Sequence, residues 1–275
     1  MLHPFNQLHA ALGIHPDMSI TDYHASPGLS KSQLDKLKIS PAHYQASLEG
    51  AFTQTPDMKT GSAVHKLVLE PESFYDSYAV LIENLDRRTK AGKEAYNDFM
   101  AANQGKELLA ADDFMLVQQM QSAIAAHKTA KRLFSNGTPE QSVFWIDDGT
   151  DVLCKCRPDW QCGNGVIVDL KTTQDASPEG FAKSCAKYNY HIQAAFYLDG
   201  LNAVAIYAQH FVFVAVEKTP PFAVGVYVLD SAALQAGRNQ YQALLELYRD
   251  CEKSGQWPAY SDSVVELSLP TWALK

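Results

Sequence analysis

Two aspartates flank a tight turn in the middle of the chain. The turn, Gly-Asn-Gly at 163–165, joins two segments whose apolar residues predict strands. If it is a three-residue loop centred on Asn164, Asp159 and Asp169 face each other on adjacent strands, with Cβ atoms about 4.5 to 5.5 Å apart. Like charges in that arrangement destabilise a sheet unless something offsets them. A bound cation is the simplest offset.

A lysine lies beside this pair of carboxylates. Lys171 is two residues beyond Asp169, so the period of a strand puts both side chains on one face. Carboxylates bind hard divalent ions such as Mg²⁺. Such an ion orients a phosphate and lowers the pKa of a bound water, and a nearby lysine can position or help deprotonate that water. The three residues therefore favour hydrolysis of a phosphodiester.

Each polar residue near this turn also has a structural interpretation. Asp159 follows a proline, where aspartate is common as a turn or cap residue, and Asp169 could be satisfied by Lys171 alone. His65 lies at the edge of an apolar helical stripe, where spacing by itself favours a partly buried structural histidine. Glu140 opens the first predicted strand, and a structural role there is favoured over an outer contact with the site.

The elements that must position these residues follow from periodicity and capping. Helical signals dominate the first half of the chain, and the apolar pattern changes to period 2 at Glu140. Helices are predicted after the N-cap residues Ser30 and Ser40 and over 60–69, 93–102, 112–134, 178–201 and 231–253. Strands are predicted over 143–147, 152–160, 166–171, 203–216 and 222–229, the first three as a meander. This order predicts a mixed α/β or α+β fold.

The composition excludes several classes of protein. The 275 residues are 46% hydrophobic and 20% charged, which excludes a disordered or collagen-like chain. A net charge of −8 argues against coating nucleic acid by bulk charge, although a local basic groove remains possible. The five cysteines lack the paired spacing of a zinc site and are interpreted as thiols. Met1–Ala10 has no export-signal pattern and no apolar run has transmembrane length, so a cytoplasmic protein is expected.

Several motifs resemble one nuclease superfamily. Arg157-Pro158-Asp159 followed by Asp169-Leu170-Lys171 resembles the PD-(D/E)xK signature, and Gly61–His65 and Gln193-xxx-Tyr197 resemble its RecB-like branch. Further motifs are similar to the RecE-type phage exonucleases, from about Asp22 to about Pro258: Tyr23-His24-Ala25, Leu29-Ser30-Lys31-Ser32, Ser40-Pro41-Ala42-His43-Tyr44, Asp86–Lys93 and Tyr190-His191-Ile192-Gln193.

The resemblance implies a fold and an activity. It implies a single nuclease domain over 1–275, with an N-terminal helical and loop extension over 1–60. Residues 61–260 would form the PD-(D/E)xK core, a central mixed sheet flanked by helices. The implied activity is a Mg²⁺-dependent exonuclease, for which Mn²⁺ could substitute, that degrades linear double-stranded DNA 5′ to 3′. The product would carry 3′ overhangs for recombination by strand annealing.

The resemblance also assigns roles to individual residues. His65, Asp159 and Asp169 would bind the metal, with the carbonyl of Leu170 as a further ligand, and Lys171 would handle the attacking water. The catalytic set would be completed by Gln193, which with Tyr197 would bind the scissile strand or support the site. A DNA-contacting loop would contain Arg87, Arg88, Lys90 and Lys93, although such a charge run is equally typical of a solvated surface.

The implied partners are DNA ends, a RecT-like single-strand annealing protein and further copies of the chain. Relatives enclose DNA as rings, so a ring-shaped homo-oligomer such as a tetramer is expected, with no membrane partner. Two alternatives stay open: a structure- or sequence-specific endonuclease with the same core, and a non-catalytic DNA-binding recombination module. The intact Asp159, Asp169 and Lys171 set argues against the second.

Overall fold

The computed structural model describes residues 12–50, 54–82 and 85–274. The segment Met1–Ala10, where no export signal was found, lies outside the described residues. A mixed α/β fold is confirmed: one five-stranded sheet has the order β10-β9-β8-β7-β4, one three-stranded sheet the order β1-β5-β6, and β2 and β3 pair apart from both. No helix within the described ranges is long and apolar enough to cross a membrane.

The first part of the chain forms short capped helices. The predicted helices after Ser30 and Ser40 are confirmed as α3 (Lys31–Ile39), which opens with a capping box, and α4 (Pro41–Glu49), which has proline at its first turn. They follow β1 (Gly13–His15) and α2 (Ile20–Ala25). The next predicted helix starts four residues earlier than expected, as α5 (Pro56–Leu69), because Thr55 caps it.

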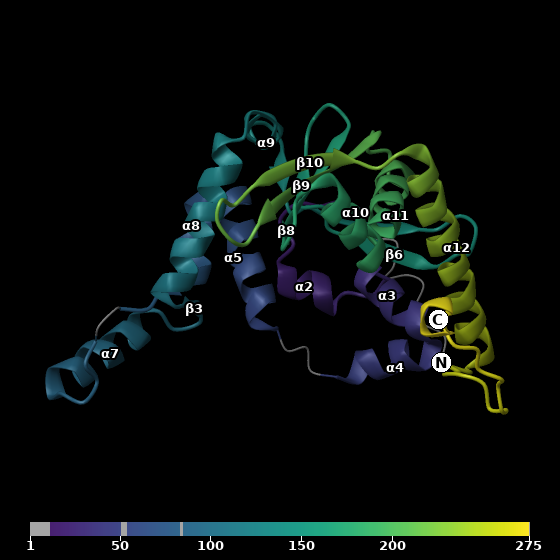
Figure 1. Cartoon of the computed structure of the whole chain (residues 1–275), viewed down its shortest axis with the longest axis horizontal. Coiled ribbons are helices and arrows are strands. Elements are labelled where there is room, and N and C mark those ends of the chain that lie inside the picture. Colours follow the sequence, from purple (N-terminus) through teal and green to yellow (C-terminus); the bar gives the residue numbers. More distant parts are fainter. Residues whose placement is uncertain (1–11, 51–53, 83–84, 275) are drawn as a thin grey trace.

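An arm projects from the body of the molecule (Figure 1). The chain passes through η1 (Pro71–Ser73) and α6 (Phe74–Ser77) into β2 (Tyr78–Val80). It then forms α7 (Lys90–Ala102) at the far end and returns through β3 (Glu107–Leu109), which pairs with β2 in parallel.

The predicted helix over 112–134 is wrong as one element. It is two helices, α8 (Ala111–Ala126) and α9 (Lys128–Leu133), broken at His127. The break has a local cause, because the His127 ring accepts a hydrogen bond from the Ala130 N–H and so caps the second helix.

The predicted three-strand meander is also wrong as one sheet. Its middle strand divides into β6 (Leu153–Cys156), which pairs with β5 (Ser142–Ile146), and β7 (Trp160–Gln161), which pairs with β8 (Val166–Thr173) and β4 (Thr138–Pro139). The chain leaves the ladder at 157–159, where Pro158 has no N–H to donate.

The second half alternates helices and strands. The predicted helix over 178–201 is two helices, α10 (Pro178–Lys187) and α11 (Tyr190–Ala203), separated by Asn189 in the left-handed conformation at φ 57°. The expected strand over 203–216 begins only at His210, as β9 (His210–Glu217), which runs parallel to β8 and antiparallel to β10 (Val224–Val228). The closing helix α12 (Ser231–Ser254) is confirmed, and η2 (Thr271–Leu274) follows it.

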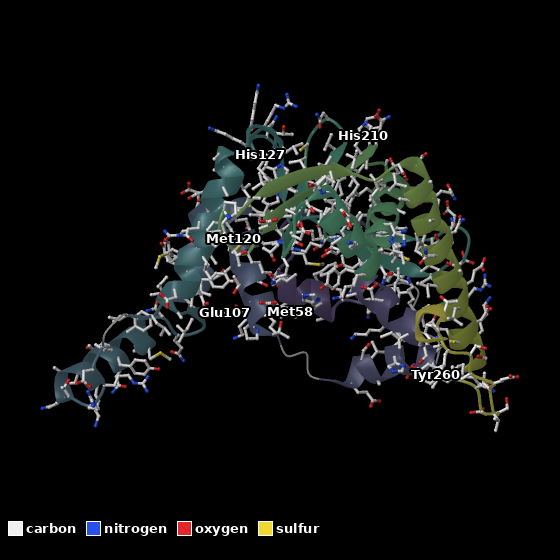
Figure 2. All side chains as sticks on the ribbon, viewed as in Figure 1. Met58, Glu107, Met120, His127, His210 and Tyr260 are labelled. Atoms are coloured by element: carbon white, nitrogen blue, oxygen red, sulfur yellow. The ribbon has the colours of Figure 1, made fainter. Side chains whose placement is uncertain are left out.

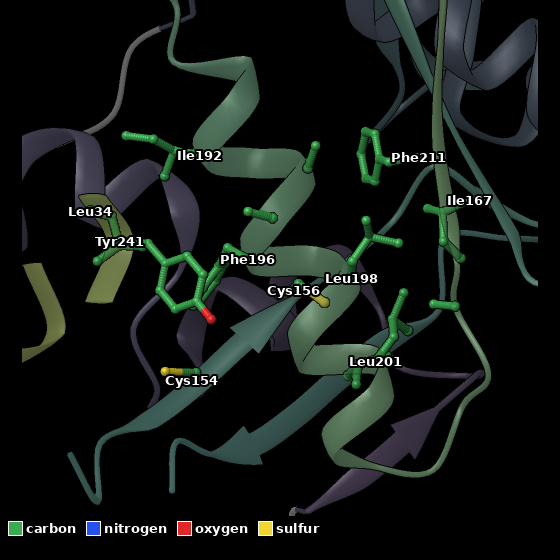
Figure 3. Close-up of a cluster of buried hydrophobic side chains, with 14 of the residues drawn as sticks. Leu34, Cys154, Cys156, Ile167, Ile192, Phe196, Leu198, Leu201, Phe211 and Tyr241 are labelled. Carbon is green, nitrogen blue, oxygen red and sulfur yellow. The ribbon is translucent and has the colours of Figure 1, made fainter. Parts of the chain in front are cut away.

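Strands β8 and β9 separate two apolar cores. Ile167, Phe211 and Phe213 face a core formed with α3, α11, α12 and the sheet of β5 and β6, and Figure 3 shows α11 crossing it. Val168 and Leu170 face a second core with α5 and α8. Because neighbouring residues of a strand point to opposite faces, the side of β8 that carries Ile167 also carries Asp169 and Lys171.

Candidate functional site

Asp169 and Lys171 form a buried ion pair on the α11 side of β8. The Lys171 Nζ lies 2.6 Å from Asp169 Oδ2, and the Asp169 side chain is almost fully buried. Gln193, on the first turn of α11, donates from Nε2 to Asp169 Oδ1 at 2.5 Å. Asp169 Oδ2 lies against the lysine ammonium and has a second lone pair. A buried carboxylate oxygen of this kind can accept a further ligand.

Asp159 reaches the same site from the end of the segment before β7. The pairing expected around the Gly-Asn-Gly turn is confirmed, with Trp160 opposite Val168. Asp159 Oδ2 accepts a hydrogen bond of 2.7 Å from the Leu170 N–H, and His65 Nδ1 of α5 lies 3.4 Å from the same oxygen. Leu170 therefore enters the site through its N–H, and its carbonyl as a metal ligand stays a prediction.

Glu140 completes a group of three possible metal ligands. One donor atom each from His65, Glu140 and Asp159 lies within 4.8 Å of the others. Glu140 has a left-handed backbone at φ 50°, and its N–H donates to the Asp159 carbonyl at 3.1 Å. Strained backbone of this kind collects at functional sites. From the sequence a structural role was favoured for Glu140, because no motif spacing links it to Asp159.

Arg157 holds Glu140 in place. Its Nε donates to Glu140 Oε2 at 2.9 Å, and its Nη1 donates to the Met18 carbonyl at 2.9 Å and to Ser142 Oγ at 2.5 Å. The arginine thus joins the segment before α2 to β5, the central strand of the three-stranded sheet. In the sequence, Arg157 stands out only as part of the Arg157-Pro158-Asp159 motif. The proline that follows it was the available signal, since it ends the strand and frees Arg157 to turn toward Glu140.

Burial and like charges perturb the site carboxylates. The pKa of Asp169 is raised to about 6. Burial is the main cause, Lys171 acts against it, and the Asp159 carboxylate adds to it. Burial, again with Asp159, raises the pKa of Glu140 to about 7. Burial lowers the pKa of Lys171, but the carboxylates of Asp169 and Asp159 outweigh it, and the pKa lies above its usual value. A divalent cation at this point would relieve the repulsion among the acids.

Tyr197 lies behind the site. Its ring makes an edge contact with Phe211, at 6.0 Å between ring centroids. The pKa of its hydroxyl lies well above the usual value. Burial is the main cause, and the carboxylates of Asp169 and Asp159 make smaller contributions. Tyr197 is thus close enough to the two carboxylates for their charges to affect it. It lies one turn after Gln193 on α11.

A groove of about 1230 Å³ opens over these residues. Its lining includes His65, Glu140 and Lys171, and it continues along the chain after β8 to Asp175. Met58 and Glu107, which also line it, lie well below His210, the first residue of β9, in Figure 2. The groove is therefore at the carboxyl ends of β8 and β9.

The predicted basic loop lies away from this groove. It precedes α7 and opens that helix at the end of the arm, far from β8 in Figure 1. Arg88 pairs with Asp86 at 3.0 Å, Lys90 lies 3.8 Å from Glu94, and the Arg87 guanidinium lies 4.3 Å from the centre of the Tyr96 ring. These residues and Lys93 are exposed. Any contact they make with DNA is distant from the site carboxylates.

The donor set fits a divalent cation. Carboxylate oxygens and one imidazole nitrogen are donors that suit Mg²⁺ or Mn²⁺, whereas soft metals prefer thiolates, and the gathered group contains no cysteine among the described residues. Asp169 Oδ2, which lies 2.6 Å from the Lys171 Nζ, adds an oxygen near the three gathered ligands. The cluster of His65, Glu140 and Asp159 can hold the ion while Asp169 remains bound by Gln193 and Lys171.

A mixed sheet that presents Asp-x-Lys on one strand and an acid just before the neighbouring strand is typical of a PDDEXK-like domain. The chain belongs to the family described as a PDDEXK-like domain of unknown function, DUF3799, whose sequence profile matches residues 30–267. No curated protein matches the sequence.

A solved structure shares the fold. A protein from Eubacterium rectale, provisionally named an exonuclease, is similar over 94% of this chain and 98% of its own, with a TM-score of 0.61 and 14% identity. An alkaline exonuclease from Laribacter hongkongensis matches over 72% of this chain and 97% of its own, with a TM-score of 0.29 and 12% identity. The first of these matches shows that the whole architecture recurs in another protein.

Proposed function

We propose that this protein is a divalent-metal-dependent exonuclease that degrades linear double-stranded DNA. The observation that carries the proposal is the buried pair of Asp169 and Lys171, 2.6 Å apart, beside the gathered ligands His65, Glu140 and Asp159. Keeping these charges together in a core costs free energy that a structural role alone would not repay. Membership of a PDDEXK-like family supports phosphodiester cleavage as the chemistry.

The chain's residues divide the chemistry among them. His65, Glu140 and Asp159 would hold the cation, with Asp169 as a further oxygen ligand. The bound ion would polarise the phosphate and lower the pKa of its bound water. Lys171, protonated and held by Asp169, orients the attacking water and donates a hydrogen bond to the phosphate oxygens. Gln193 fixes the rotamer of Asp169 and so places both charged groups.

The finer parts of the proposal come from the RecE-type resemblance. They are cleavage from 5′ to 3′, 3′ overhangs passed to a RecT-like annealing protein, and a ring such as a tetramer that encloses DNA. A ring would let a chain of net charge −8 stay on its substrate by topology, with basic residues needed only along the channel. The single-domain assignment over 1–275, with core 61–260, belongs to the same proposal.

An assay on two DNA shapes tests the activity. End-labelled linear duplex and a covalently closed circle of the same sequence are incubated with Mg²⁺ or with EDTA, using wild type and Asp169→Ala. Loss of only the linear DNA, dependent on Mg²⁺ and absent in the variant, supports the exonuclease. Cutting of the circle supports the endonuclease alternative. No metal-dependent loss of either substrate supports a binding module.

Metal affinity should depend on pH in a defined direction. Glu140, with a pKa of about 7, and Asp169, with a pKa of about 6, must lose protons to bind a cation. Both are ionised at pH 8, and Glu140 is mostly protonated at pH 6. The apparent Kd for Mn²⁺ should therefore rise about twentyfold from pH 8 to pH 6, as measured by calorimetry. In Glu140→Gln the affinity should be lower at pH 8 and much flatter with pH; an equally steep profile would contradict the assignment.

The arm offers a test of the predicted DNA-contacting loop. Arg87→Ala combined with Arg88→Ala removes two exposed cations from the segment before α7. If both contact phosphates, the slope of log affinity against log salt should become smaller by about two, with weaker binding at low salt. The matched control replaces Lys128 and Lys131 of α9, both exposed, with alanine. An unchanged slope in the arm variant would mean that the loop is solvated surface.

A further inference from the structure

Three aromatic rings form a column from the core to the wall of the groove. Phe213 of β9 is buried, and the Tyr190 ring stacks on it with centroids 5.6 Å apart and 28° between planes. Tyr188 stacks in turn on Tyr190, at 5.7 Å and 30°. Tyr188 is 49% exposed, and it lines the groove. The column thus ends in a ring that is open to the groove.

The column stands beside the lysine of the site. The Lys171 Nζ lies 4.7 Å from the centre of the Tyr190 ring. Tyr188 is therefore one stacked ring away from the ammonium group that we place on the scissile phosphate. If the phosphate of one nucleotide contacts Lys171, the base of an adjacent nucleotide can therefore reach Tyr188.

The backbone that carries Tyr188 is held rigidly. It is the break between α10 and α11, where Asn189 has φ 57°. The Asn189 side chain donates to Asp35 at 3.1 Å and accepts from Lys38 at 2.6 Å, and Lys31 donates to the Tyr188 carbonyl at 2.8 Å. Helix α3 therefore fixes the corner from outside. A ring on a fixed corner loses little conformational entropy when it binds a ligand.

A cation stands next to the exposed ring. The Lys187 Nζ lies 5.2 Å from the centre of the Tyr188 ring. Lys187 is exposed and makes no ion pair with any residue that the structure describes, unlike Lys183 one turn earlier, which pairs with Glu179 at 2.7 Å. An aromatic ring with an adjacent free ammonium group matches the base and the phosphate of one nucleotide.

We propose that Tyr188 stacks on an unpaired nucleobase of the strand being cut, and that Lys187 contacts the phosphate next to that base. This inference rests on the proposed nuclease function and narrows its substrate. A base inside a duplex has both faces covered, so only a melted terminus or a single-stranded segment offers a face to Tyr188. The enzyme would then hold its DNA end with the terminal nucleotides separated. Stacking on a ring tolerates every base, as degradation without sequence preference requires.

Fluorescence of 2-aminopurine tests the stacking directly. The probe is a duplex with two unpaired 5′-terminal nucleotides, one of them 2-aminopurine, mixed with the full chain and Ca²⁺ to slow cutting. Wild type should quench the probe. Tyr188→Ala should abolish the quenching and weaken binding about tenfold or more, whereas Tyr188→Phe should retain both, because the ring alone stacks. In cleavage with Mg²⁺, Tyr188→Ala should raise KM and change kcat by less than about threefold.

Controls distinguish a failure of the stacking inference from a failure of the proposed nuclease function. Tyr207→Ala removes a ring that is 64% exposed in the loop before β9, at the other end of the strands, and should behave as wild type. Lys187→Ala should make the salt slope of binding smaller by about one. If wild type cuts DNA and Tyr188→Ala quenches and binds as wild type does, the stacking assignment is wrong and the nuclease stands. If wild type neither binds nor cuts the probe, both are wrong.

Discussion

Lys171→Met is expected to lower the rate of phosphodiester cleavage by about a hundredfold to a thousandfold, while the protein still binds its divalent ion at pH 8. Methionine keeps the length of the side chain and removes the ammonium group that lies 2.6 Å from Asp169. That group is the ammonium that we place on the scissile phosphate. Loss of such a donor to a developing charge costs about 3 to 4 kcal/mol in transition-state stabilisation.

Metal binding by Lys171→Met is as informative as its cleavage rate. The gathered ligands His65, Glu140 and Asp159 are untouched, so Mn²⁺ affinity by calorimetry should change by less than about threefold. Single-turnover cleavage of linear duplex under saturating metal gives the rate, and Lys253→Met, at the exposed end of α12, is the matched control. Near-normal turnover by Lys171→Met would refute the role of this lysine even with the fold intact.

Asp159→Asn is expected to remove metal binding and cleavage together. The carboxylate is the common element of the site: one oxygen accepts from the Leu170 N–H and lies 3.4 Å from His65, and the group belongs to the ligand cluster with Glu140. The amide keeps the shape and can still accept from Leu170, but it loses the negative charge that hard divalent ions require. We expect at least about a hundredfold weaker Mn²⁺ binding and no detectable cutting.

Thermal unfolding provides the readout that does not depend on catalysis. An ion that binds only the folded state raises its stability by about 2.7 kcal/mol when present at a hundred times its Kd. Wild type should therefore melt at a higher temperature with Mn²⁺ than with EDTA, and Asp159→Asn should melt alike in both. The control Asp148→Asn alters an exposed aspartate in the turn after β5 and should keep the metal shift. A full metal shift in Asp159→Asn would rule this residue out as a ligand.

The charges that make the site reactive also weaken its structure. Asp169 is buried with a pKa raised to about 6 and Glu140 with one raised to about 7, so each binds protons more readily in the folded chain than in the unfolded chain. Without metal, the folded state therefore loses stability as the pH rises from the ordinary carboxyl pKa of the unfolded chain to the raised pKa of the folded chain. Near neutral pH a bound cation would restore the balance of charge, and metal binding would then be coupled to folding.

Local signals predicted much of this protein. The caps of α3 and α4, the register across 163–165 and the shared face of Asp169 and Lys171 depend on residues close in sequence, and the structure agrees with each. The family motifs led to the PDDEXK-like fold that the sequence profile and the sheet order both support. Helix breaks were missed at His127 and Asn189, where a capping side chain or a single left-handed residue interrupts a continuous helical pattern.

Tertiary structure decided which residues meet. Periodicity could place His65 on a helix edge and Glu140 at the start of a strand, but their approach to Asp159 within 4.8 Å depends on how α5 packs against β8 and how the chain leaves one sheet for the other at Pro158. The column that ends at Tyr188 likewise needs α3 to fix a corner far away in sequence. Spacing along a chain determines the faces of single elements, whereas contacts between elements come from burying those faces against one another.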